Sequence, residues 1–423
     1  WGCIPTKSLL KNAEIYDNLS NHSNDFGISF KELSIDFSKV IKRSRDISER
    51  ISKNVEMLIK KNKIDRVRGF GKLTSNKTID ILNENGDKVD TIEADKIIVA
   101  TGASPRMVSS IPVDRKDIIT SSEAMTLPEL PSSLIVVGAG AIGIEFAYFY
   151  SVLGTKVTII EMLDRILPVE DREVSDALAK SFKKRGIDIH TGAVVESATP
   201  GNNGVTVVIT KDGKTTELKA EKVLSAIGVT GNVEGIGLEE LGVELFKNHI
   251  KVDKADYSTN IPGVYAIGDV IGPPWLAHVA SAEGIHCVET LKGIHTTPVD
   301  YDNIPGCTYC QPQVASIGLT EEKARELGYT LKIGKFPFMA SGKAFAIGER
   351  DGFVKLIFDE KYGELLGAHI IGSEATEMIA ELGIARALEG TYETIIKTVH
   401  AHPTLSESVM EAAAMAKGEA IHI

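Results

Sequence analysis

The stretch SLIVVGAGAIGIEFAYFYSVLGTKVTIIE, residues 133–161, decides the fold of this chain. It opens with an apolar run, passes through a glycine-rich turn, continues with small and apolar residues, and closes on a second apolar run. Strand, glycine-rich turn, helix and strand in this order form a βαβ unit of a parallel sheet. The stretch therefore predicts an α/β fold.

The three glycines of this turn have separate tasks in binding a dinucleotide. Gly138 permits the tight turn, Gly140 lets the backbone approach a pyrophosphate, and Gly143 allows the helix to lie close to the strand. Free N–H groups and the dipole at the helix N-terminus favour the phosphates. Glu161, about twenty residues further on, can accept hydrogen bonds from a ribose and would repel a 2′-phosphate. The turn therefore predicts an NAD site, and the alternative is a glycine-rich turn without a ligand.

Composition limits the class of protein. A length of 423 residues suggests roughly two to four domains. The net charge of −11 disfavours a nucleic-acid partner, and no apolar run approaches the ~20 residues of a membrane helix, so no membrane partner is expected. Four cysteines are too few for a disulfide scaffold and favour a reducing compartment.

Periodicity and turn residues predict the elements on either side of the βαβ unit. Helices are expected at residues 5–19, 37–62, 276–294, 373–389, 392–399 and 406–416. Strands are expected at residues 66–73, 78–82 and 96–100, in a β-rich stretch at 187–228, and just before Gly268-Asp269. After Pro305 the tail reads as strands followed by helices, an α+β region distinct from the nucleotide-binding part.

Cys3 directly precedes the first predicted helix, where the helix dipole and Lys7 would favour a reactive thiolate. The alternative is a buried, unreactive cysteine. Cys307 and Cys310 form a CxxC pair, but a strand pattern follows them instead of the helix that a redox CxxC opens. Because no second pair completes a zinc site, we expect no metal and interpret the two cysteines as an incidental pair, with a redox role as the alternative. Cys287 lies in an apolar helix and is expected in the core.

His402 suits proton transfer with thiols, because the pKa of an imidazole lies near neutral pH. Glu407 can fix the tautomer of His402, or it can cap the following helix through a capping box that begins at Thr404. We favour the first role, since Glu407 is not expected to cap the helix fully and orient His402 at once; otherwise His402 is an ordinary surface histidine. The charge run at residues 164–173 is expected to be a solvated helix start rather than a site.

Five motifs follow one another in a familiar order: CIPTK, ATG, GAGAIGIE, AIGD and HPTLSE. The chain resembles the pyridine nucleotide–disulfide oxidoreductases over essentially its whole length, and its C-terminal HAHPTLSE and Glu161 most resemble the dihydrolipoyl dehydrogenase branch. The resemblance implies two Rossmann-like FAD- and NAD-binding domains, the first incomplete, and an α+β dimerisation domain. The expected boundaries are residues 1–112 for the FAD-binding domain, 113–230 for the NAD-binding domain, 231–303 for a central FAD-binding segment and 304–423 for the interface domain.

The resemblance also implies roles for single residues. Cys3 would be the flavin-side thiolate of a redox cysteine pair, and Lys7 would lie by the flavin and pair with Glu145. His402 would be the base and acid toward a dithiol, oriented by Glu407. The implied FAD contacts are Lys7, Gly71, Thr101, Gly102, Ala103, Asp269, Leu276, Ala277 and His278. The implied NAD contacts are Gly138, Gly140, Gly143, Glu161, Val195 and Gly228, and Glu145 is a cofactor-site residue on the NAD-binding helix.

By this resemblance the protein oxidises protein-bound dihydrolipoamide to lipoamide with NAD⁺, through the cysteine pair and FAD. His402 would reach the active site of the other subunit of a homodimer. The implied partners are lipoyl domains of 2-oxo acid dehydrogenase or glycine cleavage complexes. The implied location is the cytoplasm, or the mitochondrial matrix in a eukaryote.

Two departures from the family pattern leave alternatives open. The family's FAD fingerprint and the first cysteine of its CxxxxC motif are expected ahead of Trp1, and Gly228-Val-Thr-Gly-Asn232 lacks the arginine usual in this motif. One alternative is a related disulfide or mercuric reductase, although a C-terminal cysteine pair is missing and Glu161 argues against an NADP-linked glutathione reductase. The other is a non-catalytic NAD-binding fragment.

Overall fold

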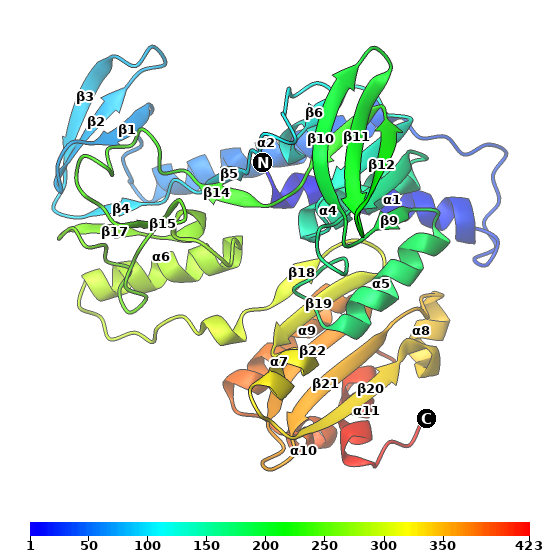
Figure 1. Cartoon of the computed structure of the whole chain (residues 1–423). Coiled ribbons are helices and arrows are strands. Elements are labelled where there is room, and N and C mark those ends of the chain that lie inside the picture. Colours follow the sequence, from blue (N-terminus) through cyan, green and yellow to red (C-terminus); the bar gives the residue numbers. More distant parts are fainter. The chain divides into compact units, whose positions relative to one another are not determined.

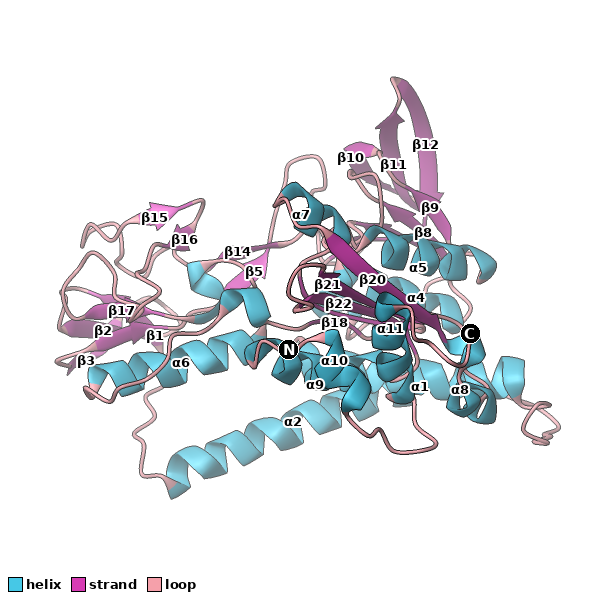
Figure 2. Cartoon of the chain, turned by 90° about the horizontal axis from the view of Figure 1, so that it is seen from below, coloured by secondary structure: helices cyan, strands magenta, loops and turns pink.

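The computed structural model describes residues 1–423, and Figures 1 and 2 show its helices and strands. They form two compact units, which are described separately. The first unit combines Trp1–Ile51, Met107–Ile227 and Asp302–Ile423, and the second combines Ser52–Arg106 and Gly228–Tyr301. None of the helices is both long and apolar enough to cross a membrane. The predicted α/β class is confirmed.

A parallel five-stranded sheet is the centre of the first unit, with the order β6-β13-β7-β8-β9. Its strands are β6 (Ile118–Ile119), β7 (Ser133–Val137), β8 (Lys156–Ile160), β9 (Asp188–His190) and β13 (Lys222–Ser225). The helix α4 (Ala141–Val152) connects β7 to β8, which confirms the predicted βαβ unit. Three antiparallel strands extend from this sheet: β10 (Val194–Gly201), β11 (Gly204–Lys211) and β12 (Lys214–Ala220).

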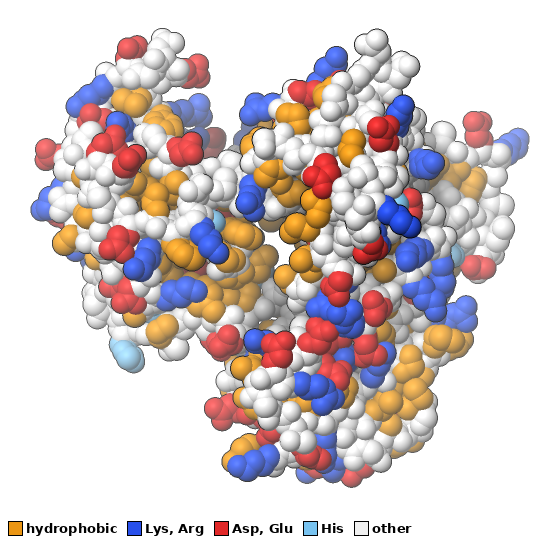
Figure 3. Space-filling model, viewed as in Figure 1, with side chains coloured by type: hydrophobic (Ala, Val, Ile, Leu, Met, Phe, Trp, Pro, Cys, Tyr) orange, Lys and Arg blue, Asp and Glu red, His pale blue; other side chains and the backbone are white.

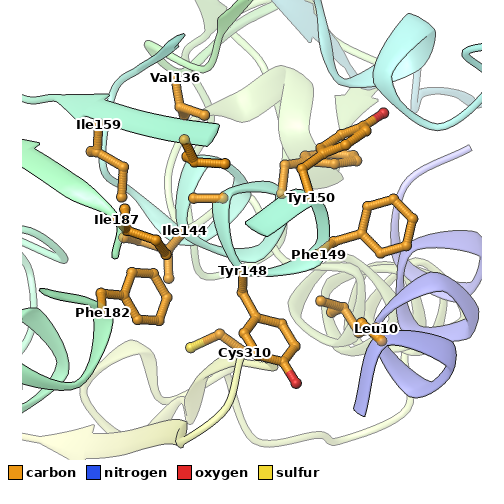
Figure 4. Close-up of a cluster of buried hydrophobic side chains, with 14 of the residues drawn as sticks. Leu10, Val136, Ile144, Tyr148, Phe149, Tyr150, Ile159, Phe182, Ile187 and Cys310 are labelled. Atoms are coloured by element: carbon orange, nitrogen blue, oxygen red, sulfur yellow. The ribbon is translucent and has the colours of Figure 1, made fainter. Parts of the chain in front are cut away.

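The helix α4 is apolar on all sides because it is enclosed by protein on all sides, as expected for a buried helix. One side faces the parallel sheet, and others face α1 (Cys3–His22) and α5 (Arg172–Lys184). Figure 4 shows this cluster, in which Leu10 of α1 and Cys310 lie near Tyr148 and Phe149 of α4. The helix that begins at Cys3 is therefore packed firmly on the helix of the predicted NAD site.

The C-terminal part of the first unit is an antiparallel sheet with the order β18-β19-β22-β21-β20. Its strands are β18 (Gly306–Thr308), β19 (Gln313–Gly318), β20 (Leu331–Pro337), β21 (Phe353–Asp359) and β22 (Leu365–Gly372). The helices of this part are α7 (Glu321–Glu326), α8 (Gly342–Ile347), α9 (Ala375–Ala387), α10 (Tyr392–Lys397) and α11 (Glu407–Lys417). Figure 2 shows α9, α10 and α11 beside this sheet. Along β21, Val354 and Leu356 share a core with α9 and α11, so Lys355 faces the opposite side.

The interpretation of residues 164–173 as a solvated helix start is wrong in part. Asp171 does cap α5, accepting from the Glu173 N–H at 3.1 Å, but it is 2% exposed and Glu170 is 6% exposed. Lys355, 1% exposed, pairs with the buried Asp171: its Nζ lies 3.0 Å from Asp171 and 2.7 Å from Glu321. This cation lies almost two hundred residues from Asp171 in sequence, so the local charge run could not reveal it.

Surface charges near this cluster have a different character. Figure 3 shows acidic and basic side chains interspersed over α5 and α7. Arg165 and Arg172 both bond Glu322 there, at 2.7 and 2.8 Å, and Arg172 also bonds Asp164 at 2.9 Å. Exposed pairs of this kind contribute little stability each. Asp164, whose side chain is 65% exposed, therefore lies at the surface as expected, whereas the Arg165 side chain is only 16% exposed.

Replacing Lys355 by methionine is expected to lower the free energy of unfolding by about 3–5 kcal/mol, because it leaves buried carboxylates without their cation. Burial raises the pKa of the Asp171 carboxyl, but His369, Lys355 and the Glu321 N–H together outweigh it and hold the pKa below its usual range. Stability from this carboxylate is present above its ordinary pKa and is lost as the pH falls below it. Urea unfolding between about pH 3 and 7 should therefore show a weaker acid dependence in the variant than in the wild type. Lys214→Met, on an exposed strand, is the control and should change little.

The second unit contains small sheets and one long helix. Its elements are β1 (Phe70–Leu73), β2 (Thr78–Leu82), β3 (Lys88–Glu93), β4 (Ile97–Val99), β5 (Ala103–Pro105), β14 (Val229–Gly231), β15 (Leu245–Phe246), β16 (His249–Ile250), β17 (Val264–Ala266), the 3₁₀ turn η1 (Gly268–Ile271) and α6 (Ala277–Leu291). The strands β4 and β17 pair in parallel, and β1, β2 and β3 form an antiparallel sheet. The helix α2 (Phe37–Lys61) begins in the first unit and ends in the second.

Shorter elements complete the chain: α3 (Ser121–Ala124), η2 (Tyr301–Asn303) and η3 (Phe338–Ala340). Cys287 of α6 is fully buried, which confirms its predicted place in the core. The predicted helices and strands are present throughout, with ends that differ by a few residues.

Candidate active site

The glycine-rich turn has the geometry that a dinucleotide requires. Gly138 has a φ of +99°, and a Cβ on it would lie 2.4 Å from the Ala226 carbonyl oxygen. A Cβ on Gly143 would lie 2.0 Å from the Gly138 carbonyl oxygen. Around Gly140, by contrast, a Cβ would meet nothing within 4 Å, and no side chain caps the helix that begins there. This open backbone at the N-terminus of α4 fits a pyrophosphate.

Glu161 stands at the end of β8 and is 8% exposed. Its Oε2 accepts the Ala139 N–H at 2.7 Å, and its Oε1 accepts the Leu163 N–H at 2.9 Å. Each carboxylate oxygen can accept a further hydrogen bond, so the group can still bind a ribose hydroxyl. The backbone contacts hold the carboxylate beside the glycine-rich turn, and Met162, 65% exposed, offers no positive charge to a 2′-phosphate.

Replacing Glu161 by glutamine is expected to raise the KM for NAD⁺ about tenfold and to improve the use of NADP⁺ relative to NAD⁺. The amide group of glutamine cannot accept both backbone N–H groups, and it no longer repels a 2′-phosphate. Steady-state kinetics with both nucleotides measure the change. Glu196→Gln, on the exposed surface of β10, is the matched control, and an unchanged nucleotide preference in Glu161→Gln would contradict the assignment.

Cys3 is the first residue of α1, and its thiol is exposed and free. One turn later, the Lys7 ammonium lies 2.9 and 2.8 Å from the two carboxylate oxygens of Glu145 on α4. The predicted Lys7–Glu145 pair is thus present, and so is the predicted position of Cys3 at a helix N-terminus. No acidic residue lies in the first turn of α1 to oppose a thiolate at this end.

Tyr309 also contacts this pair, and the sequence analysis missed it. Its N–H donates to Glu145 Oε1 at 3.0 Å, and its ring centroid lies 4.4 Å from Lys7 Nζ. The only signal in the sequence was the unexplained CxxC pair that encloses it. Tyr309 follows β18, far along the chain from both partners.

His402 and Glu407 form the second charged pair. The imidazole Nδ1 lies 2.9 Å from Glu407 Oε1, while Glu407 Oε2 accepts the Thr404 N–H at 2.8 Å. Glu407 thus contacts His402, as expected, and it does not cap α11 fully: its second oxygen takes only the Thr404 N–H, and no side chain caps the helix at Ser406. Burial raises the pKa of Glu407, but the Thr404 N–H and His402 outweigh it and lower the pKa. The capping box is only half formed, since the Thr404 hydroxyl donates to the Ala401 carbonyl.

The His402 side chain is 79% exposed. Because a carboxylate only accepts, Nδ1 carries the proton in the neutral ring and Nε2 is left as a base. No hydrogen bond joins His402 to Cys3, Lys7 or Glu145 within the chain. The imidazole is thus oriented by one carboxylate contact, and its Nε2 is open to solvent.

The residues expected to bind FAD are mostly in the second unit. Thr101 and Gly102 follow β4, where the Asn232 N–H donates to the Gly102 carbonyl at 2.9 Å and Gly102 has a φ of +73°. A Cβ on Gly102 would meet nothing within 4 Å, so the backbone there is open to a ligand. Leu276 precedes α6 without a side-chain cap, which leaves backbone N–H groups at that helix end.

The other predicted contacts take these places. Ala103 begins β5, Gly71 lies in β1, Asp269 lies in η1, and Ala277 and His278 begin α6. Burial raises the pKa of the Asp269 carboxyl. Val195 of β10 packs partly buried in the first unit, and Gly228, with a φ of +104°, begins the second. The residues present therefore fit nucleotide ligands in both units.

The CxxC pair does not have the environment of a redox centre. Burial raises the pKa of the Cys307 thiol to about 11, and it raises that of the fully buried Cys310 thiol further. A reactive thiol needs the opposite shift. Cys310 donates to the Pro312 carbonyl at 3.1 Å and packs in the core beside Tyr148 (Figure 4).

Comparison with known proteins agrees with this geometry. The chain matches the family described as pyridine nucleotide-disulphide oxidoreductase over residues 1–284, and the dimerisation domain of that family over residues 304–413. A dihydrolipoyl dehydrogenase of Zymomonas mobilis is 47% identical, with 100% of this chain and 90% of the relative covered. One of Rhizobium etli is 46% identical, with 100% and 91% covered. The crystal structure of LpdA from Mycobacterium tuberculosis gives a TM-score of 0.90 at 28% identity, with 98% and 90% covered.

The chain therefore belongs to the pyridine nucleotide-disulphide oxidoreductase family. It is an NAD-linked flavoprotein oxidoreductase with FAD and NAD(H) as cofactors, as predicted, and it carries the dimerisation domain of the family. Within the family, both relatives named above, which span the chain from end to end, are dihydrolipoyl dehydrogenases.

Proposed function

We propose that this protein oxidises dihydrolipoamide to lipoamide with NAD⁺, as its dihydrolipoyl dehydrogenase relatives are named for doing. The observation that carries the proposal is the His402–Glu407 pair, in which the 2.9 Å contact at Nδ1 leaves an exposed Nε2 as a base. Nicotinamide reduction alone needs no such base. A dithiol substrate does, because its thiols must lose protons before they can act as nucleophiles.

His402 takes a proton from the dithiol at Nε2, and Glu407 stabilises the imidazolium that results. Glu407 keeps this orientation because its other oxygen is fixed by the Thr404 N–H. Cys3 serves as the flavin-side thiol of the redox pair that the family uses. Each turnover forms one S–S bond in the substrate, transfers two electrons and one hydrogen to NAD⁺ as hydride, and releases one proton.

FAD supplies the electron transfer between dithiol and nicotinamide, which no side chain of this protein can perform. The chain contributes positions and charges. Lys7 and Glu145 set the charge near Cys3, and the open turn at Gly140 with Glu161 orients NAD⁺. Gly71, Thr101, Gly102, Ala103, Asp269, Leu276, Ala277 and His278 hold FAD in this proposal.

We also propose a homodimer in which His402 of one subunit serves the site of the other. Large apolar side chains support it: Ile384, Leu388 and Val399 are 64%, 76% and 95% exposed within the dimerisation domain. Apolar side chains of this size become buried when a protein–protein interface forms, so they are available to a partner subunit. The substrate partners in this proposal are lipoyl domains of 2-oxo acid dehydrogenase or glycine cleavage complexes. The proposed compartment is the reducing cytoplasm, which suits four free cysteines.

Protein purified from its source should show a flavin absorption spectrum and should reduce NAD⁺ with dihydrolipoamide. NADP⁺ should replace NAD⁺ poorly, and glutathione disulfide should not be reduced. A protein without flavin, or a flavoprotein that fails with dihydrolipoamide and NAD⁺, would contradict the proposal. If the protein acted better on another disulfide, it would instead be a related disulfide reductase.

A further inference from the structure

Tyr309 contacts both members of the Lys7–Glu145 pair in two different ways. Its N–H donates to Glu145 Oε1 at 3.0 Å, and the Lys7 ammonium lies over its ring, 4.4 Å from the centroid. A cation within about 6 Å of an aromatic centroid is attracted to the ring face. The backbone of one residue thus holds the carboxylate, and its side chain holds the ammonium.

The pair depends on this help. Glu145 is 4% exposed, and its carboxylate receives only the Lys7 ammonium and the Tyr309 N–H. The Lys7 side chain is 32% exposed, so its flexible stem could carry the ammonium into solvent. The ring of Tyr309 closes part of that route. Lys7 is four residues after Cys3 on the same helix, so its position sets the charge near the reactive thiol.

The cysteines on either side of Tyr309 are shielded from solvent. Cys307 is half-buried, and burial raises the pKa of its thiol to about 11. On the other side, Cys310 is fully buried in the core of α1, α4 and α5. The segment 307–310, which was expected to be an incidental CxxC pair, therefore places the Tyr309 ring between the half-buried Cys307 and the fully buried Cys310.

We propose that Tyr309 is a positioning residue that keeps the Lys7 ammonium on Glu145, and that the dimerisation domain supports the redox end of the protein through it. The proposal rests on the proposed function for its catalytic consequence, but its geometric part stands alone. Tyr309→Leu removes the ring face and keeps the backbone N–H. Tyr309→Phe keeps both and removes only the hydroxyl, which makes it the matched control.

The test is reductive methylation of the holoenzyme with formaldehyde and borohydride, followed by peptide mass spectrometry at Lys7. In Tyr309→Leu the rate of Lys7 methylation should rise about 3- to 10-fold, while Tyr309→Phe keeps the wild-type rate. Lys11, on the same helix and paired with Glu14, should be modified equally in all three proteins. The proposal would be overturned if Tyr309→Leu left the rate of Lys7 methylation unchanged, or if Tyr309→Phe raised that rate as much as Tyr309→Leu does.

Kinetics separate this proposal from the proposed function. With dihydrolipoamide, kcat should fall about 3- to 30-fold in Tyr309→Leu with little change in KM for NAD⁺, and Tyr309→Phe should restore it. If the wild type fails to oxidise dihydrolipoamide, the proposed function is lost, yet the methylation rates still decide the role of Tyr309. If methylation responds but kcat does not, Tyr309 holds Lys7 without serving the reaction, and the catalytic part is overturned.

Discussion

Replacing Cys3 by serine is expected to lower kcat for dihydrolipoamide oxidation by at least about 10³-fold, because the hydroxyl of serine cannot replace a thiolate that accepts and donates electrons. The flavin should stay bound, since the predicted FAD contacts other than Lys7 lie in the second unit of the chain. Oxidation of NADH by ferricyanide needs neither thiol and should continue. The three expectations are tested by the rate of dihydrolipoamide oxidation, the flavin absorbance of the purified variant and the rate of NADH oxidation by ferricyanide.

The control for Cys3→Ser is Cys287→Ala. Cys287 is buried in α6, where loss of one sulfur costs about 1 kcal/mol of stability but touches no reacting group. This variant should keep its dihydrolipoamide activity. If Cys3→Ser retained more than about a tenth of the wild-type kcat, Cys3 would not be the redox thiol.

Replacing His402 by glutamine is expected to lower kcat with dihydrolipoamide by about 10²–10⁴-fold, the usual contribution of a general base. Glutamine keeps the size of the side chain and can still donate to Glu407, but it cannot take up a proton. Ferricyanide activity should remain, because the hydride half of the reaction does not use this base. Stopped-flow reduction by dihydrolipoamide and by NADH separates the two halves.

A loss in both halves of the reaction would show that His402→Gln damages the fold instead of the dithiol step. His22→Gln, at an exposed end of α1, is the control for a general effect of losing a histidine. Glu407→Gln should have a smaller effect than His402→Gln, because an amide oxygen can still accept from one of the two donors.

Local pattern was enough to predict most of the fold. The βαβ unit at residues 133–161 could be predicted because its turn requires glycine: a Cβ on Gly138 or Gly143 would overlap neighbouring backbone atoms. The Lys7–Glu145 pair was available only through resemblance to a family, since 138 positions separate the two residues and no periodicity joins them. The same holds for the dithiol role of His402, whose local sequence equally suits a surface histidine.

The features that could not be predicted all depend on distant contacts. Asp171 looks solvated in the sequence until β21 brings Lys355 beside the start of α5. Tyr309 looks like a spacer in a CxxC pair until the fold lays its ring under Lys7. Glu407 could not be assigned from its residue type, because a carboxylate can either orient a histidine or accept backbone N–H groups. The geometry shows that one oxygen contacts His402 and the other accepts the Thr404 N–H.

The central claim is that Cys3 of one subunit and His402 of the other form one dithiol site, and mixed dimers test it most directly. Cys3→Ser and His402→Gln subunits, produced together with different tags, give a purified heterodimer with one site that holds both intact residues if the site is shared. We expect about half of the wild-type dihydrolipoamide activity per dimer, while each homodimeric variant is nearly inactive. A heterodimer as inactive as the two parents would show instead that Cys3 and His402 act within one subunit and that no site is shared.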